Sequence, residues 1–309
     1  MLTIHHLPDL RQPAVLCAVS GWSDAGSGAS GALRYLMEKW ATRRFAEFDA
    51  DAIYNYTVTR PATIRPGGGR RRLHWPELAW YALPCPHAQR DLVLLLGPEP
   101  DLRWRELRGA SVDLMERLGA SMLLTLGAFY AQVPHTGPVP LFGRSADPAL
   151  RGHLVALDIS DTDYQGPTGL VTALSDAAEA RGMATAGLWG AAPMYLQGTT
   201  NPKISAGLLA AAEPMIGVDL GLSELKVAGR DLERRVDEAL RDKPDFQKLV
   251  EGYGEPLDLD DDEDDEGEFP VQEHELPPTG ELPTPEEVLR GLEDYLKDLR
   301  TDDDEKPGA

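Results

Sequence analysis

The sequence predicts an α/β protein with a mostly parallel sheet covered by helices on both faces. The chain has 309 residues, of which 42% are hydrophobic and 26% charged, a composition typical of a globular protein with a sizeable core. Apolar runs of strand length alternate with longer segments of helical periodicity. Alternation of this kind favours parallel strands joined by helices that cross over the sheet.

Seven apolar runs have the length of a strand, and several are continuous enough to be buried on both faces. They are residues 14–20, 52–58, 78–83, 92–96, 122–126, 154–159 and 184–189. Five segments have helical periodicity, and they are residues 29–40, 102–118, 168–181, 202–212 and 223–241. Between residues 55 and 83 two apolar runs flank the turn-forming sequence 66–72 without a helix, which predicts a β-hairpin excursion.

The negative charge of the chain is concentrated in its C-terminal part. The formal net charge is −21, yet residues 251–309 hold 23 Asp and Glu against 4 Lys and Arg, which leaves residues 1–250 nearly neutral. We therefore expect the α/β domain to span residues 1–253. Residues 254–284 contain an acidic run, 258–266, followed by a stretch rich in proline and glutamate. Such a composition buries too little apolar surface to offset its ordering entropy and predicts a linker.

The last part of the chain, residues 285–309, predicts a short amphipathic helix and an acidic tail. Thr284-Pro285-Glu286-Glu287 has the pattern of a helix start, with proline in the first helical position. The apolar residues that follow fall on one helix face: Val288, Leu289, Leu292, Tyr295, Leu296 and Leu299. A helix of this length is marginal alone in water, so its apolar face should dock either on the protein's own oligomer or on another protein.

Composition excludes several classes of protein. No run reaches the roughly 18 apolar residues of a membrane span, and no signal peptide is visible, so we expect a cytoplasmic protein without a membrane partner. The near-neutral body argues against a nucleic-acid partner and suggests that Arg70-Arg71-Arg72 forms a solvated hairpin tip. Cys17 and Cys85 lack metal-site or disulfide spacing, so we expect them buried and reduced. We expect no metal and no cofactor.

The glycine-rich turn from Gly21 to Gly28 joins the first buried strand directly to a helix. Backbone N–H groups converge at a helix N-terminus, so a turn of this kind can hold an anion or a carboxylate. Loops rich in glycine, proline and polar residues also follow other predicted strands. Since the carboxyl ends of parallel strands meet at one edge of the sheet, these loops predict a crevice. Its ligand-binding candidates are Gly21, Ser23, Asp24, Gly26, Glu99, His135, Gly166, Thr168, Gly169 and Asn201.

Asp24, Glu99 and His135 are the candidate catalytic residues, and each also has a structural interpretation. Asp24 precedes a helix and could cap it, or could face the crevice. We expect Asp101 to cap the following helix, which leaves Glu99 as the better candidate for a ligand or a base. His135 could transfer protons or only donate hydrogen bonds from its loop. Thr168 could help to hold an anion, or could belong to a tight strand-to-helix turn. No nucleophile elbow, phosphate-binding loop lysine or zinc-binding helix accompanies them.

The ordered set of these motifs resembles the proteasome assembly chaperone 2 family, in its actinobacterial branch, over about residues 1–253. The matching pieces are Gly21-Trp22-Ser23-Asp24-Ala25-Gly26, Arg60-Pro61, Gly97-Pro98-Glu99-Pro100-Asp101 with Trp104, Leu126-Gly127-Ala128, Pro134-His135-Thr136, Tyr164 with Gly166-Pro167-Thr168-Gly169, Leu188-Trp189, Tyr195-Leu196 and Asn201-Pro202. The family pattern has arginine and histidine where this chain has Gly137 and Met194. If the corner around Gly137 and Met194 were catalytic in the family, both replacements would impair catalysis in this chain.

The resemblance implies a phosphorylase/hydrolase-like α/β architecture, a homotrimer, and a protein partner such as proteasome subunits. Our leading expectation is a non-catalytic protein-binding or assembly factor. The alternative is a small-molecule enzyme of the phosphorylase or hydrolase type, with a nucleoside-like or anionic ligand in the strand-end crevice. An ATP-dependent carboxylate-amine ligase is the least favoured interpretation, because the sequence has no ATP-binding signature.

Overall fold

A computed structural model describes residues 1–162 and 164–241 of the chain. The linker expected at residues 254–284 and the helix expected at residues 285–309 lie outside the described residues. So does the last part of the α/β domain expected at residues 1–253.

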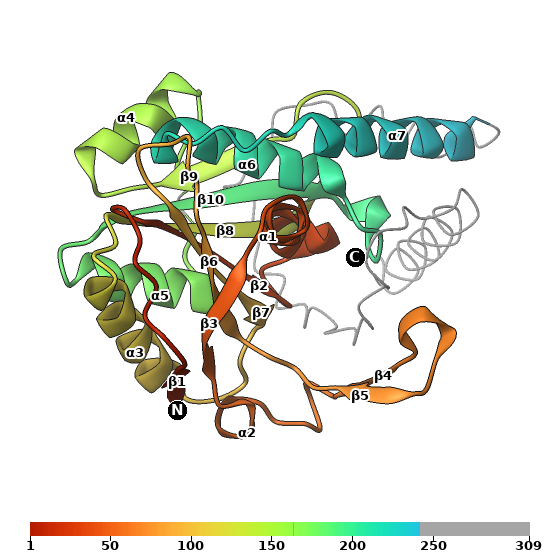
Figure 1. The fold of residues 1–309 in the computed structure, drawn as a ribbon. Coiled ribbons are helices and arrows are strands. Elements are labelled where there is room, and N and C mark those ends of the chain that lie inside the picture. Colours follow the sequence, from red (N-terminus) through yellow and green to blue (C-terminus); the bar gives the residue numbers. More distant parts are fainter. Residues whose placement is uncertain (163, 242–309) are drawn as a thin grey trace, which may run out of the picture.

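The described residues form one eight-stranded sheet in the order β1-β3-β6-β7-β2-β8-β10-β9 (Figure 1). Its strands are β1 (Leu2–Ile4), β2 (Ala14–Ser20), β3 (Arg43–Phe48), β6 (Ala79–Leu83), β7 (Leu92–Pro98), β8 (Met122–Ala131), β9 (Leu141–Arg144) and β10 (Ala184–Pro193). The four central strands, β7, β2, β8 and β10, are parallel, and antiparallel strands flank them at both margins. The predicted α/β fold class is confirmed, as a mixed sheet with a parallel centre.

Helices cover both faces of this sheet. They are α1 (Gly28–Lys39), α2 (Ala50–Ile53), α3 (Trp104–Arg117), α4 (Pro148–Ala156), α5 (Leu170–Glu179), α6 (Pro202–Ile216) and α7 (Ser223–Leu240), with 3₁₀ turns η1 (Ala25–Ser27), η2 (Pro66–Gly68) and η3 (Met194–Leu196). Helices α1 and α6 pack on one face, and α7 lies against α6 (Figure 1). Helices α3 and α5 pack on the other face.

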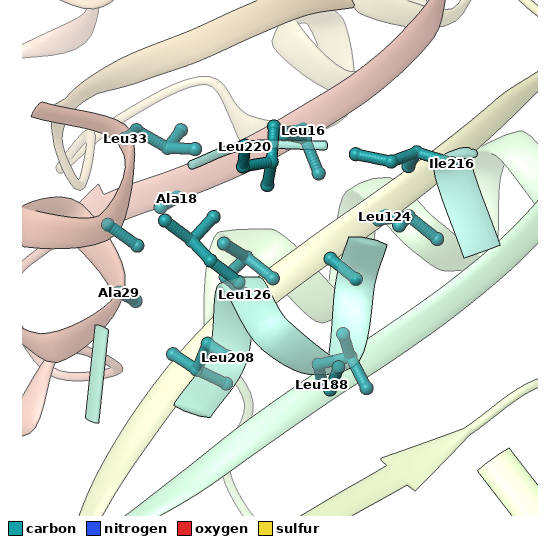
Figure 2. Close-up of a cluster of buried hydrophobic side chains, with 14 of the residues drawn as sticks. Leu16, Ala18, Ala29, Leu33, Leu124, Leu126, Leu188, Leu208, Ile216 and Leu220 are labelled. Atoms are coloured by element: carbon teal, nitrogen blue, oxygen red, sulfur yellow. The ribbon is translucent and has the colours of Figure 1, made fainter. Parts of the chain in front are cut away.

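Strand β2 lies at the centre of the core and is buried on both sides. Leu16 and Ala18 point into the cluster beneath α1 and α6, whereas Val15 and Cys17 belong to the cluster beneath α3 and α5. The two-residue period of a strand separates these side chains, which explains why a doubly covered strand is apolar at every position. Figure 2 shows the first cluster, in which side chains from β2, β8 and β10 meet those of α1 and α6.

The two cysteines are free and buried, as expected. Burial raises the pKa of the Cys17 thiol to about 12 and that of Cys85 to about 11. Since the thiolate is the reactive form, both side chains act as core residues and not as nucleophiles.

The strand predicted at residues 154–159 is wrong, because the first half of this run ends helix α4 and a turn follows it. The Asp147 carboxylate accepts hydrogen bonds from the N–H groups of Ala149 (2.9 Å) and Leu150 (3.0 Å), and proline occupies the first helical turn. This capped start sets a helical period, so that Leu150 and Leu154 share the buried face.

The strand predicted at residues 52–58 is also wrong. Helix α2 ends at Ile53, and the backbone then turns, with Val58 N–H bonded to Asn55 O at 2.8 Å. The Asn55 side chain accepts from Thr57 N–H, which gives the chain a local alternative to strand pairing. The strands β1, β3 and β9 were not predicted. They lie at the margins of the sheet, where shorter and more polar sequences suffice.

The predicted β-hairpin excursion is present. Its two strands occupy only part of residues 55–83, the segment in which it was expected. Strands β4 (Ala62–Ile64) and β5 (Arg72–His74) pair antiparallel, with Thr63 opposite Leu73, and form a separate two-stranded sheet. This hairpin lies between α2 and β6 in the sequence and projects from the body of the protein (Figure 1).

Candidate functional site

The segments that follow β2 and β7 meet at one edge of the sheet, beside the last part of β8. Glu99 N–H donates to Ser20 O at 2.8 Å, which joins the β7 loop to the β2 loop. Ala128 N–H donates to Ser23 O at the same distance, which joins the β2 loop to β8. The strand-end loops are therefore neighbours, as the parallel centre of the sheet requires.

Four candidate residues converge at the N-terminus of α5. The Oε1 atom of Glu99 accepts the Leu170 N–H at 2.6 Å. A Cβ atom added to Gly169 would lie 3.0 Å from this oxygen and 3.4 Å from Ser23 Oγ. A Cβ atom at Gly21 would lie 3.4 Å from Glu99 Cβ, and Gly21 has a φ of +133°. The two glycines thus allow the backbone to approach the Glu99 side chain closely.

Glu99 serves as the cap of α5 in this arrangement. A carboxylate at a helix N-terminus is stabilised by the helix dipole and by the free N–H groups there. Burial raises the pKa of the Glu99 carboxyl above its ordinary value, whereas the hydrogen bond from Leu170 opposes the rise. The side chain is half-buried.

The hydroxyl of Ser23 is buried beside Gly169 and has no hydrogen-bond partner among the described residues. The residue as a whole is 1% exposed. A buried polar group without a partner carries a desolvation penalty of roughly 1–3 kcal/mol. Among the buried candidate side chains, this hydroxyl is the one without a hydrogen bond to the described residues.

Asp24 caps helix α1 from the adjacent position. Its Oδ1 atom accepts the N–H groups of Ala29 (2.8 Å) and Ser30 (2.9 Å), and its Oδ2 atom accepts the Ser30 hydroxyl. Burial raises the pKa of Asp24 to about 6, although the hydrogen bonds from Ser30 oppose the rise. Of the two interpretations of Asp24, the hydrogen bonds match the capping role.

Gly26 and Asn201 join the start of α1 to the start of α6. Asn201 N–H donates to Gly26 O at 2.7 Å, and the Asn201 side chain accepts Lys203 N–H at 3.1 Å as a cap of α6. Gly26 has a φ of +59°, a conformation that glycine adopts without strain. Its N–H donates to the Tyr130 hydroxyl at 3.0 Å.

His135 belongs to a different network, between the β8 loop and helix α7. Its Nδ1 atom lies 2.8 Å from the Tyr195 hydroxyl and its Nε2 atom 3.0 Å from Asp237 Oδ1. Its backbone N–H also donates to the Tyr195 hydroxyl, and its carbonyl accepts the Lys203 ammonium. Burial lowers the pKa of His135, and the Asp237 carboxylate opposes this. The contacts match those of a hydrogen-bonding loop histidine.

The loop before α5 places the remaining candidates differently. Thr168 is exposed, and Gly166 lies against the Tyr164 ring, whose hydroxyl donates to Pro167 O at 2.9 Å. Only Gly169 of this loop reaches the convergence at Glu99. The expectation that Asp101 caps α3 is wrong, because its carboxylate accepts the Asn55 N–H at 2.7 Å and the Thr59 hydroxyl at 3.2 Å.

The structure therefore divides the candidates into two linked groups. Gly21, Ser23, Glu99 and Gly169 meet at α5, and Asp24, Gly26 and Asn201 meet at the starts of α1 and α6. His135 connects to the second group through Lys203. Sequence reasoning assigned no role in the site to Tyr130, Tyr195 or Asp237, since no local motif reveals a contact across 60 to 104 positions.

The two departures from the expected motif lie near His135 and Tyr195. Gly137 is exposed and has a φ of +74°, a conformation that favours glycine over arginine. Met194 begins the turn η3 that carries Tyr195. Nothing in the structure explains the methionine.

A family model described as the PAC2 family matches residues 18–240. The chain belongs to the PAC2 family. A PAC2 family protein from Streptomyces avermitilis is similar in structure, with 32% identity, 79% of this chain and 100% of that chain covered, and a TM-score of 0.68. A proteasome-assembly chaperone homologue from Mycobacterium tuberculosis is 31% identical over 77% of this chain and 99% of that one, with a TM-score of 0.69. These matches confirm the resemblance seen in the ordered motifs.

A further similar structure is a Mycobacterium tuberculosis protein of unknown function, with 26% identity, 82% of this chain and 89% of that chain covered, and a TM-score of 0.75. A comparison with curated proteins found no match. In the described ranges, no helix has the length and apolarity needed to cross a membrane. The same residues contain no group of three or more His, Cys, Asp or Glu side chains placed to hold a metal ion.

Proposed function

We propose that this PAC2 family member is a non-catalytic assembly factor that binds proteasome subunits. The observation that carries the proposal is the engagement of all three candidate ionisable groups in structural hydrogen bonds. Asp24 caps α1, Glu99 caps α5, and His135 bridges Tyr195 and Asp237. In these contacts the three groups hold the loops of the fold together, whereas a general base must lie within reach of a substrate proton.

The division of the candidates supports the same conclusion. Acid–base catalysis places its acid and its base around one bound substrate. Here Glu99 and His135 belong to separate hydrogen-bond networks, on loops that approach different helices. The similarity to the mycobacterial proteasome-assembly chaperone homologue supplies the class of partner.

Reconstitution with purified proteasome subunits tests this function. The protein is mixed with separately purified α-type and β-type subunits from the organism that encodes it, and complexes are followed by native mass spectrometry. We expect a complex with one subunit type and faster appearance of assembled, peptidase-active particles. Subunit mixtures without the protein give the reference rate. An unchanged rate together with no complex would overturn the proposal.

The proposal includes a homotrimer that acts in the cytoplasm. Support for the trimer comes from the family resemblance, and support for the compartment from the two free cysteines, since free thiols are typical of a reducing environment. Light scattering coupled to size exclusion measures the oligomeric state directly. A mass near three times 33.7 kDa is expected, and a monomer mass contradicts it.

The unpartnered Ser23 hydroxyl favours a second candidate function, binding of a small anionic or nucleoside-like molecule at the strand-end corner. The hydroxyl and the Glu99 carboxylate both lie beside Gly169, at the N-terminus of α5. A ligand of the native state raises the melting temperature by mass action. A thermal-shift panel of phosphate, nucleosides and nucleotides tests this, with Ser23→Ala as the matched variant. No shift with any compound removes this candidate.

A further inference from the structure

The hairpin formed by residues 55–76 carries an unusual charge for this protein. It contains Arg60, Arg65, Arg70, Arg71 and Arg72 and no Asp or Glu. We refer to residues 55–76 as the arginine arm. All five arginines are exposed. The remainder of residues 1–250 holds more acidic than basic side chains, so the arm is where the positive charge is concentrated.

The arginines of the arm have no partners among the described residues. None of the five guanidinium groups makes an ion pair or a hydrogen bond there, in contrast to Arg11 with Asp91 or Arg181 with Glu116. Five like charges on one short hairpin repel one another, and a partner of opposite charge relieves this repulsion.

The arm also exposes apolar side chains and is weakly supported by the body. Val58 is 52% exposed, Leu73 60% and Trp75 48%. Trp75 packs edge-on against Tyr56, with ring centroids 4.9 Å apart. The pairing of β4 with β5 forms its own two-stranded sheet, and an isolated hairpin is marginally stable in water. A partner that covers the arm would therefore stabilise it.

The complementary charge is present in the same chain. Residues 258–266 are acidic except for Leu259, and no Lys or Arg occurs between residues 251 and 289. Apolar residues Leu257, Leu259 and Phe269 lie within or beside the run, and could pack on the exposed apolar side chains of the arm. Both properties of the arm, charge and apolar exposure, thus have a counterpart in this segment.

The acidic run can reach the arm of its own chain. The described residues end at position 241, and the run begins 17 residues later. Seventeen residues span at most about 60 Å when extended. A domain of this size has a radius of gyration of about 18 Å and hence a diameter of about 46 Å, which is less than the span of the extended linker. A tethered segment also has an effective concentration of the order of millimolar, which favours the contact within one chain.

We propose that the arginine arm binds the acidic run, residues 258–266, of its own chain. The contact covers the guanidinium groups and the apolar side chains of the arm. The proposed assembly function does not depend on the arginine arm or on the acidic run. Either proposal can therefore be wrong while the other is right.

Energy transfer between two dyes tests the contact in the full-length protein. One dye is attached at Thr63→Cys, in the exposed strand β4, and the other at Gly267→Cys, beside the acidic run. Cys17 and Cys85 are buried and stay unlabelled. We expect strong transfer at low salt that falls by about half or more at 1 M salt, where the Debye length is about 3 Å.

Matched charge variants decide the outcome. Replacement of Arg70, Arg71 and Arg72 by Gln should lower the transfer at low salt to its high-salt value. Replacement of Arg105, Arg117 and Arg230 by Gln removes the same charge from exposed helical positions and should leave the transfer unchanged. Equal effects of the two triple variants would overturn the proposal. Transfer between singly labelled chains, in place of transfer within one chain, would also overturn it.

Discussion

The imidazole of His135 and the carboxylate of Asp237 lie 3.0 Å apart, although 102 residues separate them. Asp237 is on helix α7, and His135 is on the loop that follows β8. The Lys203 ammonium, on α6, donates to the His135 carbonyl and lies 3.3 Å from Glu233. The histidine thus connects the outer helices to the strand-end loops.

His135 should make the stability of the protein fall as the pH falls. Its pKa is lowered in the folded state, so the unfolded chain takes up the proton first, and stability is lost as the pH drops below about 6.5. Urea unfolding of wild type and His135→Gln, at fixed protein concentration, measures this. The variant should lose less stability between pH 7 and pH 5. Asp237→Asn removes the charge that opposes the shift and should make the dependence steeper than that of the wild type. Equal slopes in all three proteins would contradict the assignment.

Asp24 should act in the opposite direction over a lower range of pH. Burial raises its pKa from 3.8 to about 6, so the folded state takes up the proton first and gains stability as the pH falls from 7 toward 4. Asp24→Asn keeps an oxygen that can accept the N–H groups of Ala29 and Ser30 but does not titrate. The wild type should therefore gain stability relative to this variant on acidification. A constant difference in unfolding free energy from pH 7 to pH 5 would refute the raised pKa.

Gly97 should tolerate no side chain. A Cβ atom there would overlap the Glu77 carbonyl oxygen and would lie 2.6 Å from Leu78 Cα. Since these are backbone atoms directly before β6, Gly97→Ala should lose about 3 kcal/mol of stability. A Cβ atom added to Gly109 in α3 would meet no other atom within 4 Å, so Gly109→Ala should gain roughly 0.5–1 kcal/mol. Chemical denaturation compares the pair, and similar effects of the two substitutions would show the close approach to be incorrect.

Two buried serines should respond differently to replacement by alanine. Ser205 Oγ donates to Gly28 O at 2.7 Å, so Ser205→Ala should lose about 1 kcal/mol. Within residues 1–162 and 164–241 Ser23 Oγ has no partner, so Ser23→Ala removes a desolvated group and should be neutral or stabilising. Thermal unfolding of both variants measures the contrast. A loss at Ser23 as large as that at Ser205 would reveal a partner for the Ser23 hydroxyl.

Local sequence patterns predicted the central elements well. The run at residues 14–20 coincides with β2, and the segment at 29–40 matches α1 within one residue, because continuous apolar and helical periods are strong over such lengths. The strand predicted at 154–159 is wrong because this apolar run is too short to show a clear period. It is short enough to suit either a strand or a helix, and the Asp147 cap decided for the helix.

The candidate site was predicted in part. Glycines and acids after the strands indicated the corner where Gly21, Glu99 and Gly169 meet. The hydrogen-bond partners of these residues could not be inferred, because each partner comes from a distant segment. Leu170 is 71 residues from Glu99, and Asp237 is 102 residues from His135. Spacing along the chain carries no information about such pairs.

The sequence by itself determined the α/β class, the family and the separation of the acidic C-terminal part from a nearly neutral body, since apolar periodicity, ordered motifs and charge are local properties of the chain. The tertiary structure decided the roles of the candidate residues. Whether a carboxylate caps a helix or faces a ligand depends on which N–H groups the packed helices bring to it, and only the packing of α1, α5, α6 and α7 supplies them.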